Sequence, residues 1–133
     1  MTRSPDSTSI ATTTEIGRVA ESRALRYLEA AGLVLLTRNY RCRAGEIDLV
    51  MLDAEAQVLV LVEVRSRTSV AHGSAAATVG ARKQRRFILA ARHLMLTRPQ
   101  YRALAARIDV VAIDPAPDGG PAQLTWIRDA FRA

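Results

Sequence analysis

Residues 45–67 read GEIDLVMLDAEAQVLVLVEVRSR, and this stretch determines the expected architecture. Glu46–Leu52 and Val58–Arg67 are rich in aliphatic and β-branched residues, which favours two strands, and Asp53–Gln57 between them predicts a tight hairpin. The second strand is apolar on both faces, as is typical of a central strand. We therefore expect a sheet built around an antiparallel pair.

The chain on the N-terminal side of this hairpin predicts one helix and one strand. Residues 1–13 are rich in Ser and Thr and are expected to form a flexible tail. A capping-box pattern predicts a helix that starts near Thr13, and Gly32 stands where a C-cap glycine belongs. Leu33–Tyr40 then predicts a short strand.

The C-terminal half predicts a second helix and one or two more strands. The helix is expected over Ala81–Thr97, ended by Pro99. Its expected apolar face consists of Phe87, Ile88, Ala91 and Met95. Ile108–Ile113 and Leu124–Arg128 predict strands on either side of the loop DPAPDGGP. The order of elements indicates one α/β domain with a mixed sheet over residues 14–133.

The composition limits the classes of function. The chain has 133 residues, of which 49% are hydrophobic and 24% charged, as in one globular domain. Its 19 Lys and Arg against 13 Asp and Glu give a net charge of +6, which favours nucleic acid as a partner before an anionic membrane. Cys42 is the only cysteine, which excludes an intrachain disulfide and a cysteine-based zinc cluster. Without an apolar run of roughly 18 residues or a signal-peptide core, a cytoplasmic protein is expected.

Two carboxylates interrupt the apolar strands of the hairpin. Charged side chains are almost never fully buried unless they are paired or bind metal, and Glu63 lies within VLVLVEV. A hairpin centred on Ala54–Gln57 places Asp48 nearly opposite Glu63, with Cβ atoms about 4.5–5.5 Å apart. Two carboxylates this close repel each other unless a proton or a cation lies between them. A hard cation such as Mg²⁺ prefers such oxygen ligands.

A structural ion pair explains the same residues equally well. Arg65 lies two positions beyond Glu63 on the same face, and Arg67 follows near the strand end. Either arginine could neutralise Asp48 or Glu63. Glu46 shares the face of Asp48 but lies nearer the end of its strand, where a solvated rim residue is expected. Spacing alone leaves the ion pair and the metal site open.

An acidic residue on one strand followed by Glu-x-Lys on the next is the signature of the PD-(D/E)xK, or restriction-endonuclease-like, nucleases. The chain from Gly17 to Phe131 resembles the YraN family of predicted endonucleases, which are similar to archaeal Holliday-junction resolvases. The resemblance rests on GRVAESRALRYLEAAGL (17–33), NYRCRAGEIDLVMLD (39–53), LVLVEVRSR (59–67), KQRR (83–86), RIDVVAID (107–114) and WIRDAF (126–131). It implies a restriction-endonuclease-like core of α-β-β-β-α-β order with a mixed sheet flanked by helices, and a homodimer.

The resemblance also implies roles for individual residues. Asp48 and Glu63 match the metal-binding carboxylates, and the main-chain carbonyl of Val64 would complete the site. Glu21 matches a helix carboxylate aimed at the same centre, although a solvated helix residue is the plain alternative. Arg65 matches the catalytic lysine. The implied activity is hydrolysis of phosphodiester bonds in DNA, branched DNA included, with Mg²⁺ or Mn²⁺ lowering the pKa of a bound water.

Arg65 departs from the lysine of that signature. Lysine can shift its pKa and exchange a proton, whereas arginine stays charged. Arg65 could hold a phosphate or stabilise a transition state, but it is a poor general base. A nucleic-acid-binding protein with weak or no cleavage is therefore the alternative. A structural dimerisation protein, with carboxylates paired to arginines, is a third.

The last expectations concern a surface for nucleic acid. Five side chains of the second helix fall opposite its apolar face, where they either contact phosphates or face solvent: Arg82, Arg85, Arg86, Arg92 and His93. Gln84 falls on the apolar side and Lys83, the only lysine, on the flank, and both could reach substrate.

Three arginines that precede the Asp48 strand are expected to flank a groove for DNA: Arg38, Arg41 and Arg43. Arg67 is a further expected contact with nucleic acid. Aromatic residues are only 5% of the chain, so duplex or branched DNA is favoured over a stacked single strand, with RNA left open. His72, in a loop rich in Gly and Ala, is a weaker candidate. Trp126 and Phe131 are expected to pack rather than bind.

Overall fold

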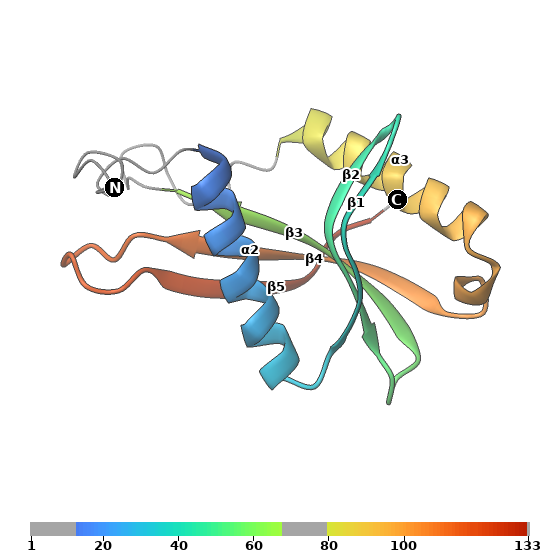
Figure 1. Cartoon of the computed structure of the whole chain (residues 1–133), viewed down its shortest axis with the longest axis horizontal. Coiled ribbons are helices and arrows are strands. Elements are labelled where there is room, and N and C mark those ends of the chain that lie inside the picture. Colours follow the sequence, from blue (N-terminus) through green and yellow to red (C-terminus); the bar gives the residue numbers. More distant parts are fainter. Residues whose placement is uncertain (1–12, 68–79, 133) are drawn as a thin grey trace, which may run out of the picture.

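A five-stranded sheet between two helices forms the centre of the molecule (Figure 1). The structure is a computed structural model that describes residues 13–67 and 80–132. Along this part of the chain the elements are α2 (Thr13–Ala30), β1 (Val34–Cys42), β2 (Gly45–Asp53), β3 (Val58–Ser66), α3 (Ala81–Thr97), the 3₁₀ turn η2 (Pro99–Tyr101), β4 (Ala105–Asp114) and β5 (Gln123–Phe131).

The sheet is mixed, as the sequence predicts. The strands lie in sequence order, β1-β2-β3-β4-β5. Every neighbouring pair is antiparallel except β3 and β4, which run parallel. A parallel pair needs a long crossover connection, and α3 lies within the one that joins β3 to β4.

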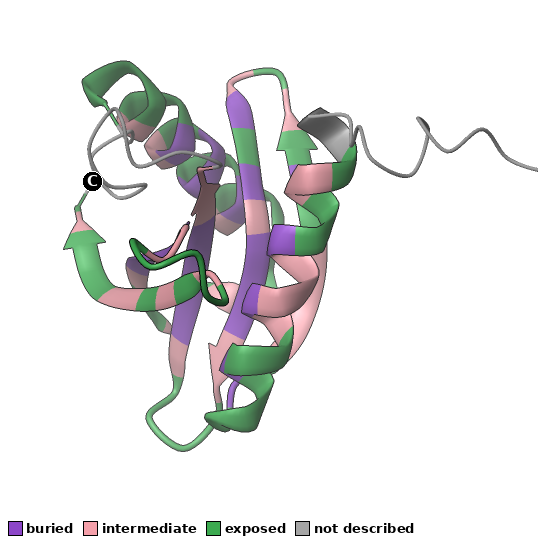
Figure 2. Ribbon diagram, turned by 90° about the vertical axis from the view of Figure 1, so that its left-hand side faces the viewer, coloured by how far each residue is buried: buried purple, intermediate pink, exposed green. Residues whose placement is uncertain are grey.

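Each helix covers one face of the sheet, and each face has its own apolar core (Figure 2). The core under α2 contains Ala20, Ala24, Leu28, Leu49, Met51, Val60, Val62 and Val111. The core under α3 contains Phe87, Ala90, Leu94, Val50, Leu59, Leu61 and Ile108. Alternate residues of β3 serve the two cores, which explains why this strand is apolar on both faces.

Both helices end where the sequence predicts. Gly32 has a φ of +101°, its N–H donates to the Glu29 carbonyl at 3.0 Å, and the N–H of Leu33 donates to the Leu28 carbonyl at 3.1 Å. This is a Schellman motif, which needs a residue that tolerates positive φ. The limits of α3 match the prediction, and Pro99 follows at the start of η2.

Several predicted details differ from the structure. β4 is longer than Ile108–Ile113 because its pairing with β3 begins at Ala105, and β5 is longer than Leu124–Arg128 because its pairing with β4 runs from Gln123 to Phe131. β1 likewise runs on to Cys42. The buried face of α3 is Phe87, Ala90, Ala91 and Leu94, whereas the expected Ile88 and Met95 are only partly buried.

Some expectations fall outside the structure or concern the membrane. The expected tail up to residue 12, the loop rich in Gly and Ala, and His72 lie outside the described residues. Neither helix in the described part is long and apolar enough to cross a membrane.

Candidate active site

Asp48 and Glu63 lie where β2 and β3 separate. The pairing of these strands runs from Asp53↔Val58 to Leu49↔Val62, which confirms the expected register. Beyond Leu49, β2 turns away from β3 and continues beside β1 toward α3 (Figure 1). The two carboxylates are the first residues past the last pair, so they stand at an open fork in the sheet.

The backbone changes course at this fork. Residues two apart on a strand normally face the same side, yet Ile47 packs in the core under α3 and Leu49 in the core under α2. On β1, Asn39 lies between the partners of these two residues and has a φ of 56°, a left-handed conformation that asparagine tolerates. The hairpin therefore twists about Asp48, which frees its side chain from both cores.

A cavity of about 610 Å³ opens at the fork between the N-terminal halves of the two helices. One group of its lining residues is acidic: Glu21, Glu46, Asp48 and Glu63. A second group is basic: Arg65, Arg82, Lys83 and Arg86. The wall is completed by uncharged residues: Ile16, Gly17, Ala20, Val64 and Ser66. The sequence predicts seven of these eight charged residues as catalytic or nucleic-acid-binding residues, and Glu46 as a rim residue.

The two central carboxylates have different partners. Asp48 Oδ2 accepts the main-chain N–H of Val64 at 2.7 Å. Glu63 is 9% exposed, and its Oε1 accepts a bond from Arg65 Nη1 at 3.3 Å. The ion pair that the structural alternative predicts is thus present for Glu63. Among the described residues, Asp48 forms no ion pair with either Arg65 or Arg67.

Both carboxyls have raised pKa values, and in each case burial is the largest cause. Burial raises the pKa of Asp48 to about 8, with a further contribution from the negative charge of Glu63, while the bond from Val64 opposes the shift. Burial also raises the pKa of Glu63, while the positive charges of Arg65 and Lys83 lower it. Without a cation, the pair therefore keeps a proton at neutral pH.

Glu21 of α2 is held in place at the edge of the same cavity. Its side chain is 15% exposed, and Arg38 Nε lies 3.5 Å from its Oε1. The Asn39 amide, oriented with its nitrogen toward Glu21, donates to the same oxygen at 3.1 Å. Glu21 is therefore not a freely solvated helix residue, and its negative charge also raises the pKa of Asp48, after burial and Glu63.

Close packing holds the basic wall against the hairpin. Arg82, Lys83 and Arg86 are exposed on the first two turns of α3. The backbone of Gly45, at the start of β2, lies against the backbone of Arg86, where an added Cβ would come within 2.3 Å of the carbonyl oxygen. Only glycine allows this approach. The contact fixes the distance between the strand that carries Asp48 and the helix that carries the basic residues.

The arginines expected to contact DNA are not all on one surface. Arg67 has a side chain only 8% exposed and lies 3.9 Å from Asp114, so it is not an exposed phosphate contact as expected. Arg38 points to α2, where its Nη2 donates to Ser22 Oγ at 2.8 Å. Arg41 is exposed and pairs with the rim residue Glu46 at 3.4 Å.

Arg43 is exposed at the tip of the β1–β2 hairpin. Gln84 is half-buried and does not line the cavity, although the sequence predicts that it reaches substrate.

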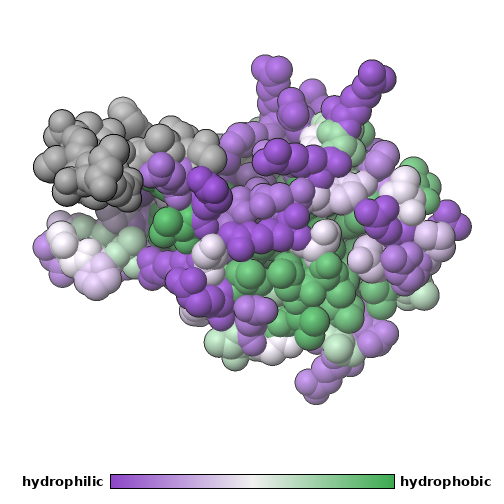
Figure 3. Space-filling view, in the orientation of Figure 1, coloured by the Kyte–Doolittle hydropathy of each residue, from purple (hydrophilic) through white to green (hydrophobic). Residues whose placement is uncertain are grey.

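Figure 3 shows hydrophilic side chains along the upper edge of the molecule, over α3 and the hairpin tip, and a hydrophobic area near the start of β1. The exposed basic residues Arg41, Arg43, Arg82, Lys83 and Arg86 belong to the hairpin and α3.

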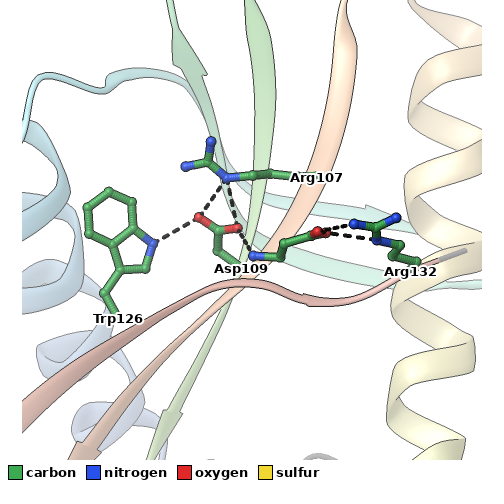
Figure 4. Close-up of polar contacts among 5 residues, drawn as sticks. Arg107, Asp109, Trp126 and Arg132 are labelled. Carbon is green, nitrogen blue, oxygen red and sulfur yellow. Dashed lines mark hydrogen bonds and ion pairs between the residues drawn. The ribbon is translucent and has the colours of Figure 1, made fainter. Parts of the chain in front are cut away.

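Sequence reasoning missed a second buried carboxylate, Asp109 of β4. It is fully buried, accepts bonds from Arg107 Nε at 3.0 and 3.2 Å and from Trp126 Nε1 at 2.8 Å, and also accepts the N–H of Asp129 at 2.9 Å (Figure 4). The signal was available, because Asp109 interrupts an apolar strand just as Glu63 does. This network fastens β5 to β4. It confirms that Trp126 packs, as does Phe131, whose ring lies 5.7 Å from that of Phe87.

The carboxylates do not enclose a metal ion by themselves. Within residues 13–67 and 80–132, no group of three His, Cys, Asp or Glu side chains is placed to hold one. A cation at Asp48 and Glu63 would need main-chain and water ligands as well. Mg²⁺ is commonly bound in this way, by one or two carboxylates together with waters and substrate phosphate.

The fold and this cavity define a mixed α/β protein with two carboxylates, the half-buried Asp48 and the buried Glu63, at an open sheet end and a basic wall beside them. The chain belongs to the UPF0102 family, the YraN family that the sequence resembles: residues 20–113 match the sequence model described as "Uncharacterised protein family UPF0102". This matched segment includes Glu21, Asp48, Glu63 and Lys83.

Relatives from several bacteria match most of the chain. A UPF0102 protein of Ralstonia pickettii is 50% identical over 122 residues, covering 90% of this chain and 91% of the relative. A UPF0102 protein of Cupriavidus metallidurans is 48% identical over 119 residues, covering 90% and 82%. One from Burkholderia pseudomallei is 51% identical over 118 residues, covering 89% and 76%. The names of these relatives give the family and do not state an activity.

Proposed function

We propose that this protein is a metal-dependent endonuclease of the restriction-endonuclease-like class that hydrolyses phosphodiester bonds in DNA. The observation that carries the proposal is the carboxylate pair at the fork, Asp48 and Glu63, facing basic residues of α3 across a cavity of about 610 Å³. The element order α-β-β-β-α-β, followed by β5, is the order that the resemblance implies. Branched DNA is the proposed substrate and a homodimer the proposed assembly.

The chemistry of the carboxylate pair fits a hard divalent cation. Burial raises the pKa values of both Asp48 and Glu63, and repulsion by Glu63 raises that of Asp48 further; a cation between the two carboxylates would relieve this repulsion. The carbonyl of Val64, which lines the cavity, would add a third oxygen. When bound, Mg²⁺ or Mn²⁺ would supply Lewis acidity toward the phosphate and a bound water of lowered pKa.

The other charged side chains around the cavity would each have a separate role toward the phosphate. The acidic wall excludes a phosphate from direct contact with Asp48 and Glu63 unless a cation intervenes. The exposed side chains of Arg82 and Arg86 would attract the DNA backbone and hold it beside the cavity. Arg65, held near Glu63, would add positive charge at the point where negative charge develops on the phosphate.

One observation favours a second function, that of a nucleic-acid-binding module without cleavage. Arg65 stands where the nuclease signature has lysine, and its guanidinium is already within 3.3 Å of Glu63. Arginine does not exchange a proton at neutral pH. A protein that keeps the basic wall and loses turnover would show this arrangement.

The test is cleavage of labelled linear, flapped and four-way-junction DNA with Mg²⁺, with Mn²⁺ and with EDTA. Wild type is compared with Asp48→Asn and Glu63→Gln, and with the control Glu55→Gln in the exposed turn of the β2–β3 hairpin. We expect metal-dependent cleavage that the first two substitutions reduce at least ~10²-fold and the control leaves unchanged. DNA binding without cleavage in any metal would support the binding module instead.

A further inference from the structure

The cation nearest the carboxylates is already engaged. Arg65 follows Glu63 on β3, and its Nη1 lies 3.3 Å from Glu63 Oε1. Its side chain is 22% exposed. A guanidinium held by a buried carboxylate can offset charge, but moving it to a phosphate would leave Glu63 buried beside Asp48 with less compensation.

Lys83 lies across the cavity from this pair. The buried residues Phe87, Ala90 and Leu94 lie four, seven and eleven residues after it, so Lys83 continues the row of α3 that faces the sheet. It is exposed because it lies at the end of the helix that borders the cavity, past the separation of β2 and β3. The sequence placed it on the flank, and the observed buried face brings it into line with the cavity.

The charge of Lys83 is directed at the cavity and is not neutralised there. Its ammonium is close enough to Glu63 to act on that carboxylate electrostatically. Among the described residues, no carboxylate oxygen lies within the 4 Å of an ion pair with Lys83. It is also the only lysine in the chain, among 18 arginines. The cavity is therefore lined by one ammonium that forms no ion pair with a described carboxylate, opposite the Arg65 guanidinium, which pairs with Glu63.

We propose that Lys83 of α3, rather than Arg65 of β3, is the catalytic residue that binds the phosphate group to be cleaved. This assignment rests on the proposed function and names the side chain that contacts its substrate. The ligand is a phosphodiester in a nucleic-acid backbone. An ammonium on a flexible stem can follow a phosphate into the cavity as a compact charge. Arg82 and Arg86, on the same two turns, contact the phosphates that flank it.

The experiment compares full-length wild type with Lys83→Gln, Lys83→Arg and the control Arg26→Gln. Arg26 is exposed on α2 and does not line the cavity. On the DNA that wild type cleaves, we expect Lys83→Gln to lower kcat/KM by about 10²-fold or more, as for the loss of one transition-state donor. Lys83→Arg keeps the charge and is expected to retain most of the activity. Arg26→Gln is expected to match wild type.

A second measurement does not depend on cleavage. Fluorescence anisotropy with labelled four-way-junction DNA in EDTA, over a series of salt concentrations, counts phosphate contacts from the slope of log K against log salt. We expect Lys83→Gln to reduce this slope by about 1, and Arg26→Gln to leave it unchanged. Circular dichroism melting confirms that each variant is folded.

The outcomes separate the two proposals. If wild type cleaves DNA and Lys83→Gln cleaves equally well, the assignment of Lys83 is wrong and the nuclease stands. If wild type cleaves nothing while the slope falls for Lys83→Gln alone, the nuclease is wrong and Lys83 is a phosphate contact of a binding module. An unchanged slope with Lys83→Gln, or an equal fall with Arg26→Gln, overturns the contact.

Discussion

Two places in the sheet bury carboxylates, and they differ in what surrounds them. Asp109 is fully buried and accepts bonds from the Arg107 guanidinium, the Trp126 indole and the Asp129 main chain (Figure 4). Asp48 faces another buried carboxylate, Glu63, and accepts the N–H of Val64. The first site is complete without a ligand, whereas at the second the charge of Glu63 acts against that of Asp48 and the nearby Arg65 pairs with Glu63 alone.

This difference distinguishes a structural carboxylate from a functional one. A buried charge is stable where donors of opposite polarity surround it, and the Asp109 network meets that condition. The fork keeps two carboxylates together at a cost in stability, beside a cavity open to solvent. Two carboxylates held this close are stable together only when a cation or a shared proton offsets their repulsion.

The largest expected effect is a loss of stability on substitution of Asp109. Asp109→Ala leaves the Trp126 indole N–H, the Asp129 N–H and the Arg107 guanidinium without their buried acceptor. We expect the free energy of unfolding to fall by about 3–5 kcal/mol, measured by urea denaturation. A loss below about 1 kcal/mol would show that Asp109 does not hold β5 against β4.

The next effect concerns the contact between the hairpin and α3. Gly45→Ala places a Cβ 2.3 Å from the Arg86 carbonyl oxygen, so one backbone must move. We expect a loss of about 1–3 kcal/mol in the same denaturation experiment, together with weaker DNA binding because the basic wall shifts. The matched control is Gly17→Ala in α2, where nothing lies within 4 Å of the added Cβ. It is expected to stabilise the helix by roughly 0.5–1 kcal/mol.

At the fork, we expect a substitution to raise the free energy of unfolding, whereas Asp109→Ala and Gly45→Ala lower it. Asp48 has a pKa of about 8 in the folded chain and an ordinary value of 3.8 when exposed. Between these pH values the unfolded chain binds fewer protons, so without metal the free energy of unfolding falls as pH rises from about 4 to about 8. Asp48→Asn, which can still accept the Val64 N–H, removes the contribution of Asp48 to this dependence.

We expect Asp48→Asn to be more stable than wild type at pH 8 in EDTA by roughly 1–3 kcal/mol, and equal to it near pH 4. Urea denaturation at the two pH values measures both differences. A variant less stable than wild type at pH 8 would mean that Asp48 is as well partnered as Asp109.

The smallest effect is expected at Arg65. Arg65→Lys restores the residue of the nuclease signature, but Glu63 holds the new ammonium as it holds the guanidinium. Because an exchange of one cation for another in a partly exposed pair changes little, we expect kcat/KM to change by less than about threefold in the DNA cleavage assay. A rise of tenfold or more would assign the reacting cation to β3 and contradict the role of Lys83.

The sequence predicts the fork because its evidence is local. The alternation of apolar residues and the short turn set the register of β2 and β3, and that register brings Asp48 close to Glu63. The ends of both helices follow from Gly32 and Pro99, which act within a few residues.

Other features depend on packing between distant segments. The end of the β2–β3 pairing at Leu49↔Val62 is set by the twist of the hairpin toward α3, through the contact of Gly45 with Arg86. The sequence predicts that Arg67 contacts nucleic acid or pairs with Asp48 or Glu63, but it is buried beside Asp114, a partner 47 positions away. Asp109 could have been identified from its apolar strand, but its partners on β5 could not.

The most direct test of the contrast between the two sites is a titration with Mn²⁺, followed by electron paramagnetic resonance of the free ion. Wild type is compared with Asp48→Asn, Glu63→Gln and the rim control Glu46→Gln, all at pH 7.5. The account predicts saturable binding to wild type and to Glu46→Gln, and loss of this binding in Asp48→Asn and in Glu63→Gln. Equal binding by wild type and Glu63→Gln, or no saturable binding by wild type, would contradict it.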